Sequence, residues 1–353
     1  MLSSHHLCHF GSISLKLYLV GSWLIPTLLG GASPVDKKVP SLEKGAILLP
    51  ARSPHRAPFE HAAINPFAAQ EPVEAVYRIN RSKVATAASF LADAEVRQLL
   101  DAAEAADPQM RAIEEIAKRY GRFSAAAFYA LGVAAISYQL SAKGEVHWRL
   151  AASYAREDPL ADLRRFASSS PSLRFARSAR LSRVEKLARL WPPFEARLGE
   201  YSRDLELLRR EIASALSADA DSKTVVFAVK MFYYTAKAFG IRVEVPPRIP
   251  LPVDRRVCLI SLASGVVEDG PPTLENARRL LSEAPRLVAT AWSEACEPSG
   301  VPPLKLDALL WLLGGCYEEG GGPSRAAELA AELFPPLPPR AASFVRFLLG
   351  LSP

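Results

Sequence analysis

The chain has 353 residues and a formal net charge of +6. This length is enough for one large or two moderate domains, each with its own core, and the modest charge is only weak support for an anionic partner. The four cysteines lie far apart and form no C-x-x-C pair, which excludes a four-cysteine zinc site or iron–sulfur cluster. We therefore expect no metal and no cofactor, and cysteines that are buried in a reduced compartment.

Residues 1–81 show little of the periodicity of packed helices or strands. The uncharged run Leu17–Gly31 is shorter than the about 20 residues that a membrane-spanning helix needs, so no membrane span is predicted. Small residues after this run also fit a secretory signal. We favour a disordered or non-native extension, because the rest of the chain has the pattern of an intracellular protein. Met110 is the next methionine after the first residue, and a start codon for Val or Leu near residues 73–84 would remove the extension.

Residues 82–353 have the pattern of one mostly α-helical domain. Apolar residues recur at helical spacing, and short alternating β patterns are almost absent. A Pro-rich segment and a final apolar helix end the chain. The other predicted helices are Val84–Ala106, Gln109–Tyr120, Ser124–Leu140, Leu181–Leu190, Tyr201–Leu216, Lys223–Phe239, Arg255–Gly265, Leu274–Leu281, Ala284–Glu297, Leu304–Leu313 and Ser324–Leu333.

A run of basic residues lies between residues 164 and 189, where Glu185 is the only acid. A solvated helix face usually carries both signs of charge, whereas a run of one sign suits a surface that binds phosphates. The run is therefore consistent with nucleic-acid binding without deciding it. Its members are Arg164, Arg165, Arg174, Arg177, Arg180, Arg183, Lys186 and Arg189.

Residues 201–239 have the pattern of a helix-hairpin-helix. The polar link 218–222, Ala-Asp-Ala-Asp-Ser, separates two helices, and the second helix begins close to Lys223. An extended link with four prolines follows at residues 243–252, and Asp254 precedes the next helix. Three residues of the hairpin are plausible N-caps for the second helix: Asp219, Asp221 and Ser222.

Four sequence phrases are distributed over residues 84–316. They are Ile136–Glu145 with Trp148, Lys223–Lys230, Ile249–Val257 and Val301–Trp311. Together with the hairpin they resemble the archaeal 8-oxoguanine branch of the helix-hairpin-helix DNA glycosylases, the AGOG family. The hairpin lacks the Gly-x-Gly that is common in that superfamily, and residues 1–80 match nothing in the family. The resemblance implies a mostly α fold with two helical subdomains and an active site in the cleft between them.

The resemblance also implies a bifunctional N-glycosylase/AP lyase of base-excision repair, with Lys223 and Asp254 as catalytic residues. A lysine in the first turn of a helix faces the positive end of the helix dipole, and partial burial adds to this, so some neutral amine is available to attack the sugar C1′. The alternative for Lys223 is a solvated lysine in the first turn of the helix, without a catalytic role. Asp254 is either a helix cap or a carboxylate that stabilises positive charge on the sugar, and the two roles are compatible.

Recognition of the damaged base requires a flipped nucleotide that is stacked and hydrogen-bonded. Phe227 lies one helical turn after Lys223, although a core phenylalanine is the alternative. Lys230, one turn further, resembles a family residue near the base, and a surface lysine is the alternative. Asp307 and Trp311, spaced i and i+4, resemble the base-binding pair of the family. Asp307 would accept from guanine N1–H, and the Trp311 indole would donate.

Three further residues complete the predicted base pocket. Gln139 offers both a donor and an acceptor, and Pro252 resembles a position that lines the pocket through its carbonyl. Ser170, in an irregular run of serines, is also expected near the base. The second stacking residue is left unassigned.

Two other interpretations stay open. One is a glycosylase of the same fold for another damaged base, although the missing four-cysteine cluster argues against the endonuclease III and MutY-type branches. The other is a non-catalytic helix-hairpin-helix DNA-binding protein. For the enzyme we expect a monomer that acts on duplex or single-stranded DNA containing 8-oxoguanine or abasic sites. We expect it in the cytoplasm of an archaeal cell, associated with the nucleoid.

Overall fold

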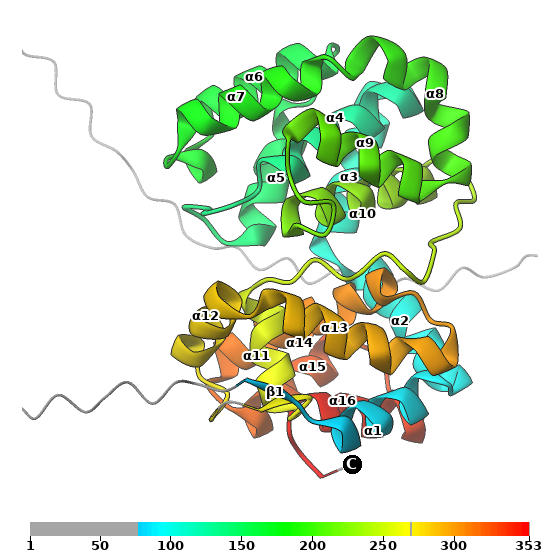
Figure 1. Cartoon of the computed structure of the whole chain (residues 1–353), viewed down its shortest axis with the longest axis vertical. Helices are drawn as coiled ribbons and strands as arrows, with labels where there is room; N and C mark the ends of the chain where they lie inside the picture. The colour runs from blue at the N-terminus through cyan, green and yellow to red at the C-terminus, as the bar shows by residue number, and fades with distance from the viewer. Residues whose placement is uncertain (1–76, 269, 353) are drawn as a thin grey trace, which may run out of the picture. The chain divides into compact units, whose positions relative to one another are not determined.

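The computed structural model describes residues 77–268 and 270–352. Within these ranges the chain forms sixteen α-helices, two short 3-10 helices and one pair of two-residue strands (Figure 1). The predicted mostly helical class is therefore confirmed. Most of the extension predicted for residues 1–81 lies outside the described residues. Residues 78–79, which we had assigned to that extension, form a strand of the helical domain.

Two hydrophobic cores divide the elements into two lobes. The first lobe contains α3 Pro108–Tyr120, α4 Phe123–Ala135, α5 Gly144–Tyr154, α6 Pro159–Ser169, α7 Arg177–Ala188, α8 Trp191–Arg203, α9 Leu205–Leu216 and α10 Lys223–Ala238. The second lobe contains β1 Arg78–Ile79, α1 Arg81–Leu91, α2 Ala94–Ala106, α11 Arg255–Ala263, β2 Val267–Glu268, α12 Leu274–Glu283, α13 Pro285–Cys296, α14 Pro303–Gly320, α15 Pro323–Leu333 and α16 Pro339–Leu348. Strands β1 and β2 are antiparallel, with Arg78 opposite Glu268. The chain passes between the lobes twice, at Asp107 and through residues 239–254.

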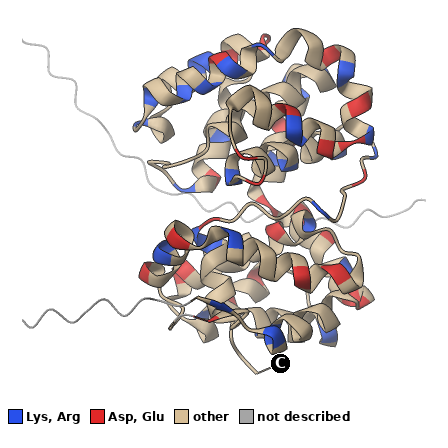
Figure 2. Cartoon of the chain, viewed as in Figure 1, with Lys and Arg blue, Asp and Glu red and all other residues tan. Residues whose placement is uncertain are grey.

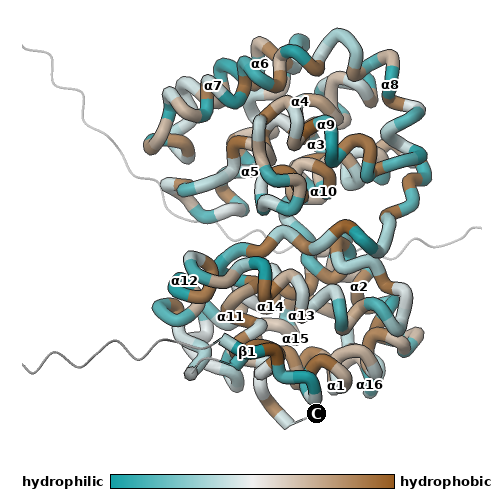
Figure 3. The backbone as a smooth tube through the Cα atoms, viewed as in Figure 1, coloured by the Kyte–Doolittle hydropathy of each residue, from teal (hydrophilic) through white to brown (hydrophobic). Residues whose placement is uncertain are grey.

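The first lobe is built around α4 and α10, which pack against each other. All residues of α4 from Ser124 to Ala135 and all residues of α10 from Val225 to Ala236 are buried. In Figure 3 hydrophobic colours accordingly run along much of both helices. Burial of the middle of α10 leaves its first turn, with Lys223, at the edge of the lobe. None of the described helices is long and apolar enough to span a membrane.

Polar caps explain two boundaries that differ from the predicted ones. The predicted helix Val84–Ala106 is divided by Asp93, whose side chain accepts a hydrogen bond from the Glu95 backbone N–H and caps α2. Asp204 caps α9 in the same way, so that helix begins at Leu205, later than predicted. A capping carboxylate satisfies N–H groups that have no partner within the helix, which makes it a better start for a helix than an interior position.

Other elements were missed or predicted too long. Helices α5, α6 and α8 were not predicted; α6 and α8 have proline in the first turn, where the missing N–H costs nothing. The predicted helix Ser124–Leu140 ends at Ala135. It is followed by a loop, residues 136–143, in which Gln139 adopts the left-handed backbone conformation with φ of 45°. This loop forms part of the wall of the site described next.

Candidate active site

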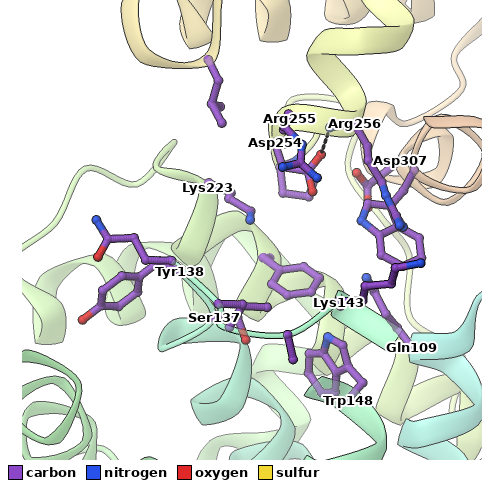
Figure 4. A pocket seen from close by; sticks show the side chains of 18 of the residues that line it. Gln109, Ser137, Tyr138, Lys143, Trp148, Lys223, Asp254, Arg255, Arg256 and Asp307 are labelled. Carbon is purple, nitrogen blue, oxygen red and sulfur yellow. Dashed lines mark hydrogen bonds between the residues drawn. The ribbon is translucent and has the colours of Figure 1, made fainter. Parts of the chain in front are cut away.

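A cavity of about 950 Å³ is lined by side chains from both lobes (Figure 4). The first lobe contributes Gln109, Trp148, Lys223 and Phe227, together with the loop 136–143. The second lobe and the segment that leads into it contribute Pro252, Asp254, Arg256, Asp307 and Trp311. The cleft expected between two helical subdomains is therefore present, and it collects most of the predicted site residues.

Lys223 is the first residue of α10, and its half-buried side chain points into the cavity (Figure 4). The preceding residue, Ser222, has the extended backbone of an N-cap, but its side chain makes no capping hydrogen bond and its buried Oγ has no partner. Among the described residues no ion pair or side-chain hydrogen bond engages the Lys223 ammonium. The amine is therefore available to a ligand at the positive end of a helix.

Asp254 lies across the cavity from Lys223, at the start of α11 (Figure 4). Its Oδ1 accepts hydrogen bonds from the backbone N–H groups of Arg256 and Val257, at 2.9 and 3.1 Å. Asp254 is thus the N-cap of α11, as one of the two predicted roles required. The cap uses one carboxylate oxygen and fixes the side chain, while no hydrogen bond or ion pair with the described residues engages Oδ2.

A buried charge cluster supports the Asp307 side of the cavity. The ammonium of Lys230, 1% exposed, lies 2.6 Å from Asp307 Oδ2 and 3.2 Å from Asp107 Oδ2. Burial disfavours the ammonium, but the two carboxylates outweigh that effect and raise the pKa of Lys230. Burial also raises the pKa of Asp307 to about 6, against the opposing effect of Lys230. The interpretation of Lys230 as a surface lysine is wrong, because the residue is buried. Lys230 does not line the cavity but binds Asp307, which does, so the predicted place of Lys230 in the base pocket is corrected to a contact through Asp307.

Two aromatic side chains form another wall. Phe227 and Trp148 both line the cavity and pack edge to face, with 5.7 Å between ring centroids. Phe227 also belongs to the core of the first lobe, as the alternative for this residue required, and its contact with the base stays a prediction. Trp148 was not assigned to the site, although it lies in one of the four phrases that carry the family resemblance. It is the candidate for the stacking residue that the sequence analysis could not place.

The structure adds Gln109 to the site and weakens the case for Gln139. Both residues line the cavity. Gln109, in the first turn of α3, is buried, and its Oε1 accepts a hydrogen bond from Lys230 at 3.3 Å. Gln139 is exposed and contributes its backbone carbonyl to the Arg180 guanidinium. Gln109 was missed because it belongs to none of the four phrases and is more than a hundred residues away from its partner Lys230 in the sequence.

Pro252 lines the cavity as predicted, but Ser170 does not. Ser170 is fully buried at the end of α6, where its Oγ is 2.8 Å from that of Ser172. Ser172 is in turn hydrogen-bonded to the buried imidazole of His147. Burial lowers the pKa of His147 to about 3, so this residue is neutral. Ser170 therefore belongs to a network that holds loops together and has no direct access to the cavity.

The basic run is concentrated on α6 and α7, as Figure 2 shows, but only part of it faces solvent. Arg180 is fully buried and donates to the carbonyls of Ile136 and Gln139, which ties the loop 136–143 to α7. Arg180 is therefore not part of an exposed basic surface. Three side chains of the run are exposed and form no ion pair with the described residues: Arg174, Arg177 and Arg189.

Comparison with known proteins agrees with this geometry. The AGOG family model, described as N-glycosylase/DNA lyase, matches residues 88–337. The chain belongs to the AGOG family.

Relatives of the family are found in several archaea. An N-glycosylase/DNA lyase of Pyrobaculum aerophilum is 33% identical over 216 residues, which cover 60% of this chain and 78% of the relative. A protein of the same description from Methanopyrus kandleri is 33% identical over 233 residues, with 64% and 88% covered. A crystal structure of the P. aerophilum AGOG 8-oxoguanine DNA glycosylase, complexed with 8-oxoguanosine, superposes with a TM-score of 0.57 at 28% identity. It covers 76% of this chain and 97% of that one.

Membership in the AGOG family confirms the predicted fold and enzyme class: this chain is an N-glycosylase/DNA lyase that acts on DNA. The interpretation as a non-catalytic DNA-binding protein is thereby set aside. The match begins at residue 88 and ends at residue 337, so it includes the first lobe, most of the second lobe and all residues that line the cavity.

Proposed function

We propose that this protein excises 8-oxoguanine from DNA and then cleaves the strand at the resulting abasic site, through a Schiff base on Lys223. The observation that carries the proposal is the pairing of Lys223 with Asp254 across one cavity, whose remaining walls offer aromatic faces and hydrogen-bonding groups. The AGOG structure from P. aerophilum, whose ligand is 8-oxoguanosine, supports the choice of base.

In the proposed reaction the neutral amine of Lys223 forms a bond to the sugar C1′ while the bond from C1′ to the base breaks, and its electron pair leaves with the base. The amine then loses a proton and the sugar ring opens, which gives the Schiff base. Removal of a proton from C2′ expels the 3′ phosphate. Asp254 stabilises the positive charge that develops on the sugar. Its carboxylate is held in place by the two backbone N–H groups that it caps.

The base is held on the other side of the cavity in this proposal. Phe227 and Trp148 offer aromatic faces, and Asp307 Oδ1 accepts from guanine N1–H while Oδ2 stays bonded to Lys230. The Trp311 indole and the Gln109 amide supply further donors, and Pro252 lines the same pocket through its carbonyl. A pocket that binds one base through several polar groups discriminates strongly against other bases, because a wrong base leaves some of the buried groups without a hydrogen-bond partner.

Borohydride trapping on a duplex with a single 8-oxoguanine tests the proposal. Lys223→Gln is expected to abolish both the covalent adduct and strand cleavage while lesion DNA still binds. Lys143→Gln is the matched control, since this exposed lysine lines the same cavity, and its adduct should persist. If Lys223→Gln still forms the full amount of covalent adduct, the nucleophile is another residue and the proposed mechanism is wrong.

We further propose that the enzyme acts as a monomer, because one chain supplies both walls of the cavity. Both duplex and single-stranded DNA are proposed as substrates, and the cytoplasm, in association with the nucleoid, as the location. Three buried cysteines without disulfide partners are consistent with a reduced compartment. Sedimentation of the free protein and activity on the two forms of DNA would check these points.

A further inference from the structure

The ring of Trp311 is packed against a guanidinium and a glycine. The Arg256 guanidinium carbon lies 4.2 Å from the centroid of the ring, within the range of a cation–π contact. At Gly144 a Cβ atom would lie 3.0 Å from Trp311 Cζ2, so any larger residue there would press on the indole. Trp311 is 7% exposed and lines the cavity. The position of the indole is thus set by its neighbours rather than by its own rotamer alone.

Arg256 is itself held firmly by two carboxylates. Its Nη1 lies 2.8 Å from Glu145 Oε1, and its Nε lies 3.2 Å from Glu318 Oε2. Glu145 belongs to α5 of the first lobe and Glu318 to α14 of the second lobe, so the guanidinium is held by both lobes. A planar guanidinium with two charged partners has little freedom to rotate.

Two glycines of α14 leave the space that Arg256 occupies. A Cβ at Gly314 would lie 2.9 Å from the Arg256 backbone oxygen, and a Cβ at Gly315 would lie 3.3 Å from the guanidinium. The backbone N–H of Arg256 also donates to Asp254 Oδ1. Helix α14, which carries Asp307 and Trp311, and the start of α11 can therefore approach only because these positions lack side chains.

We propose that Arg256 is a positioning residue for base recognition, which aims the Trp311 indole N–H at the base. The inference rests on the proposed function of Trp311 in the base pocket. A thioether or amine in place of the guanidinium leaves the Arg256 backbone bond to Asp254 intact but frees the indole to rotate. Excision of 8-oxoguanine then suffers, whereas cleavage at a preformed abasic site, where no base is read, does not.

A double-mutant cycle with two substrates tests this inference. Arg256→Met, Trp311→Phe and the double variant are compared for kcat/KM on a duplex with one 8-oxoguanine and on a duplex with one abasic site. We expect Arg256→Met to lower excision about tenfold and to change abasic-site cleavage less than about twofold. The double variant should be no worse than Trp311→Phe, because phenylalanine has no N–H left to aim.

Arg340→Met is the matched control, since Arg340 lies 4.2 Å above the Phe90 ring, remote from the cavity, and its loss should leave both activities unchanged. If Arg256→Met does not fold, Glu145→Gln loosens the same guanidinium and should show a smaller difference between the two substrates in the same direction. Equal losses on both substrates, or losses that multiply in the double variant, would overturn the positioning role. An unchanged rate of excision for Trp311→Phe would instead overturn the proposed base pocket, and the positioning role with it.

Discussion

At the scale of single residues, Asp254 is a helix cap for which we also propose a chemical role. Oδ1 caps α11, and Oδ2 takes no part in the cap. Asparagine caps helices about as well as aspartate, so a substitution can separate the two roles.

We expect Asp254→Asn to lower the single-turnover rate of excision about 100-fold or more, because it removes a charge beside a cationic sugar. The melting temperature should change little. Asp93→Asn, at the N-cap of α2, makes the same chemical change far from the cavity and should leave the rate unaltered. If Asp254→Asn keeps nearly full activity, the residue is a cap and nothing more.

Protonation of Asp307 should lower the rate of base excision at acidic pH. Burial raises the pKa of its carboxyl to about 6, so the group is ionised above that pH and protonated below it. Only the ionised form accepts a hydrogen bond on both oxygens. We therefore expect kcat/KM for 8-oxoguanine to fall as the pH drops through about 6, with no such fall for a preformed abasic site. In Asp307→Asn, kcat/KM for 8-oxoguanine should be lower and should no longer fall as the pH drops through about 6. If the fall persists in this variant, another group is responsible for it.

At the scale of elements, α10 connects Lys223, the proposed nucleophile, to the buried cluster that contains Asp307. Lys223 begins the helix, and Lys230, two turns later, is buried between Asp307 and Asp107. Removal of one partner from a buried ion pair leaves an uncompensated charge, which usually costs more than the pair contributes.

Lys230→Met should therefore lower the free energy of unfolding by about 3–5 kcal/mol. Chemical denaturation monitored by circular dichroism measures this loss. The double variant Lys230→Met/Asp307→Asn should recover part of the stability, because it removes one of the stranded carboxylates. Lys237→Met, on the same helix but with a side chain 38% exposed, should be milder. If Lys230→Met leaves the free energy of unfolding unchanged, the cluster is not fully desolvated.

Much of this could be predicted from the sequence where local signals are strong. The start of α10 at Lys223 and the cap at Asp254 follow from turn and capping residues next to them in the chain. Gln109 and the burial of Lys230 could not be predicted, since they depend on helices more than seventy residues apart that meet only in the folded chain. Helix α8 was not predicted, although its two prolines lie in the first turn, where proline is tolerated.

At the scale of the whole molecule, DNA affinity should depend on the exposed part of the basic run. We expect Arg174→Ala/Arg177→Ala to reduce the slope of log K against log salt by about 0.9 for each lost phosphate contact. Arg119→Ala/Arg325→Ala is the control, because both arginines are exposed but already paired with glutamates. An unchanged slope for the first pair would mean that this surface faces away from DNA.

The two lobes divide the residues of the cavity between them: Lys223 and Phe227 belong to the first lobe, Asp307 belongs to the second, and Asp254 is the N-cap with which the second lobe resumes. Neither hydrophobic core contains a complete centre. Catalytic activity therefore depends on the position of one lobe relative to the other. We expect this activity to be lost at a lower temperature than the one at which either hydrophobic core unfolds. On gradual heating, we expect the midpoint of reversible inactivation to lie below the midpoint of helix loss in circular dichroism. Coincident midpoints would mean that the lobes separate only when they unfold.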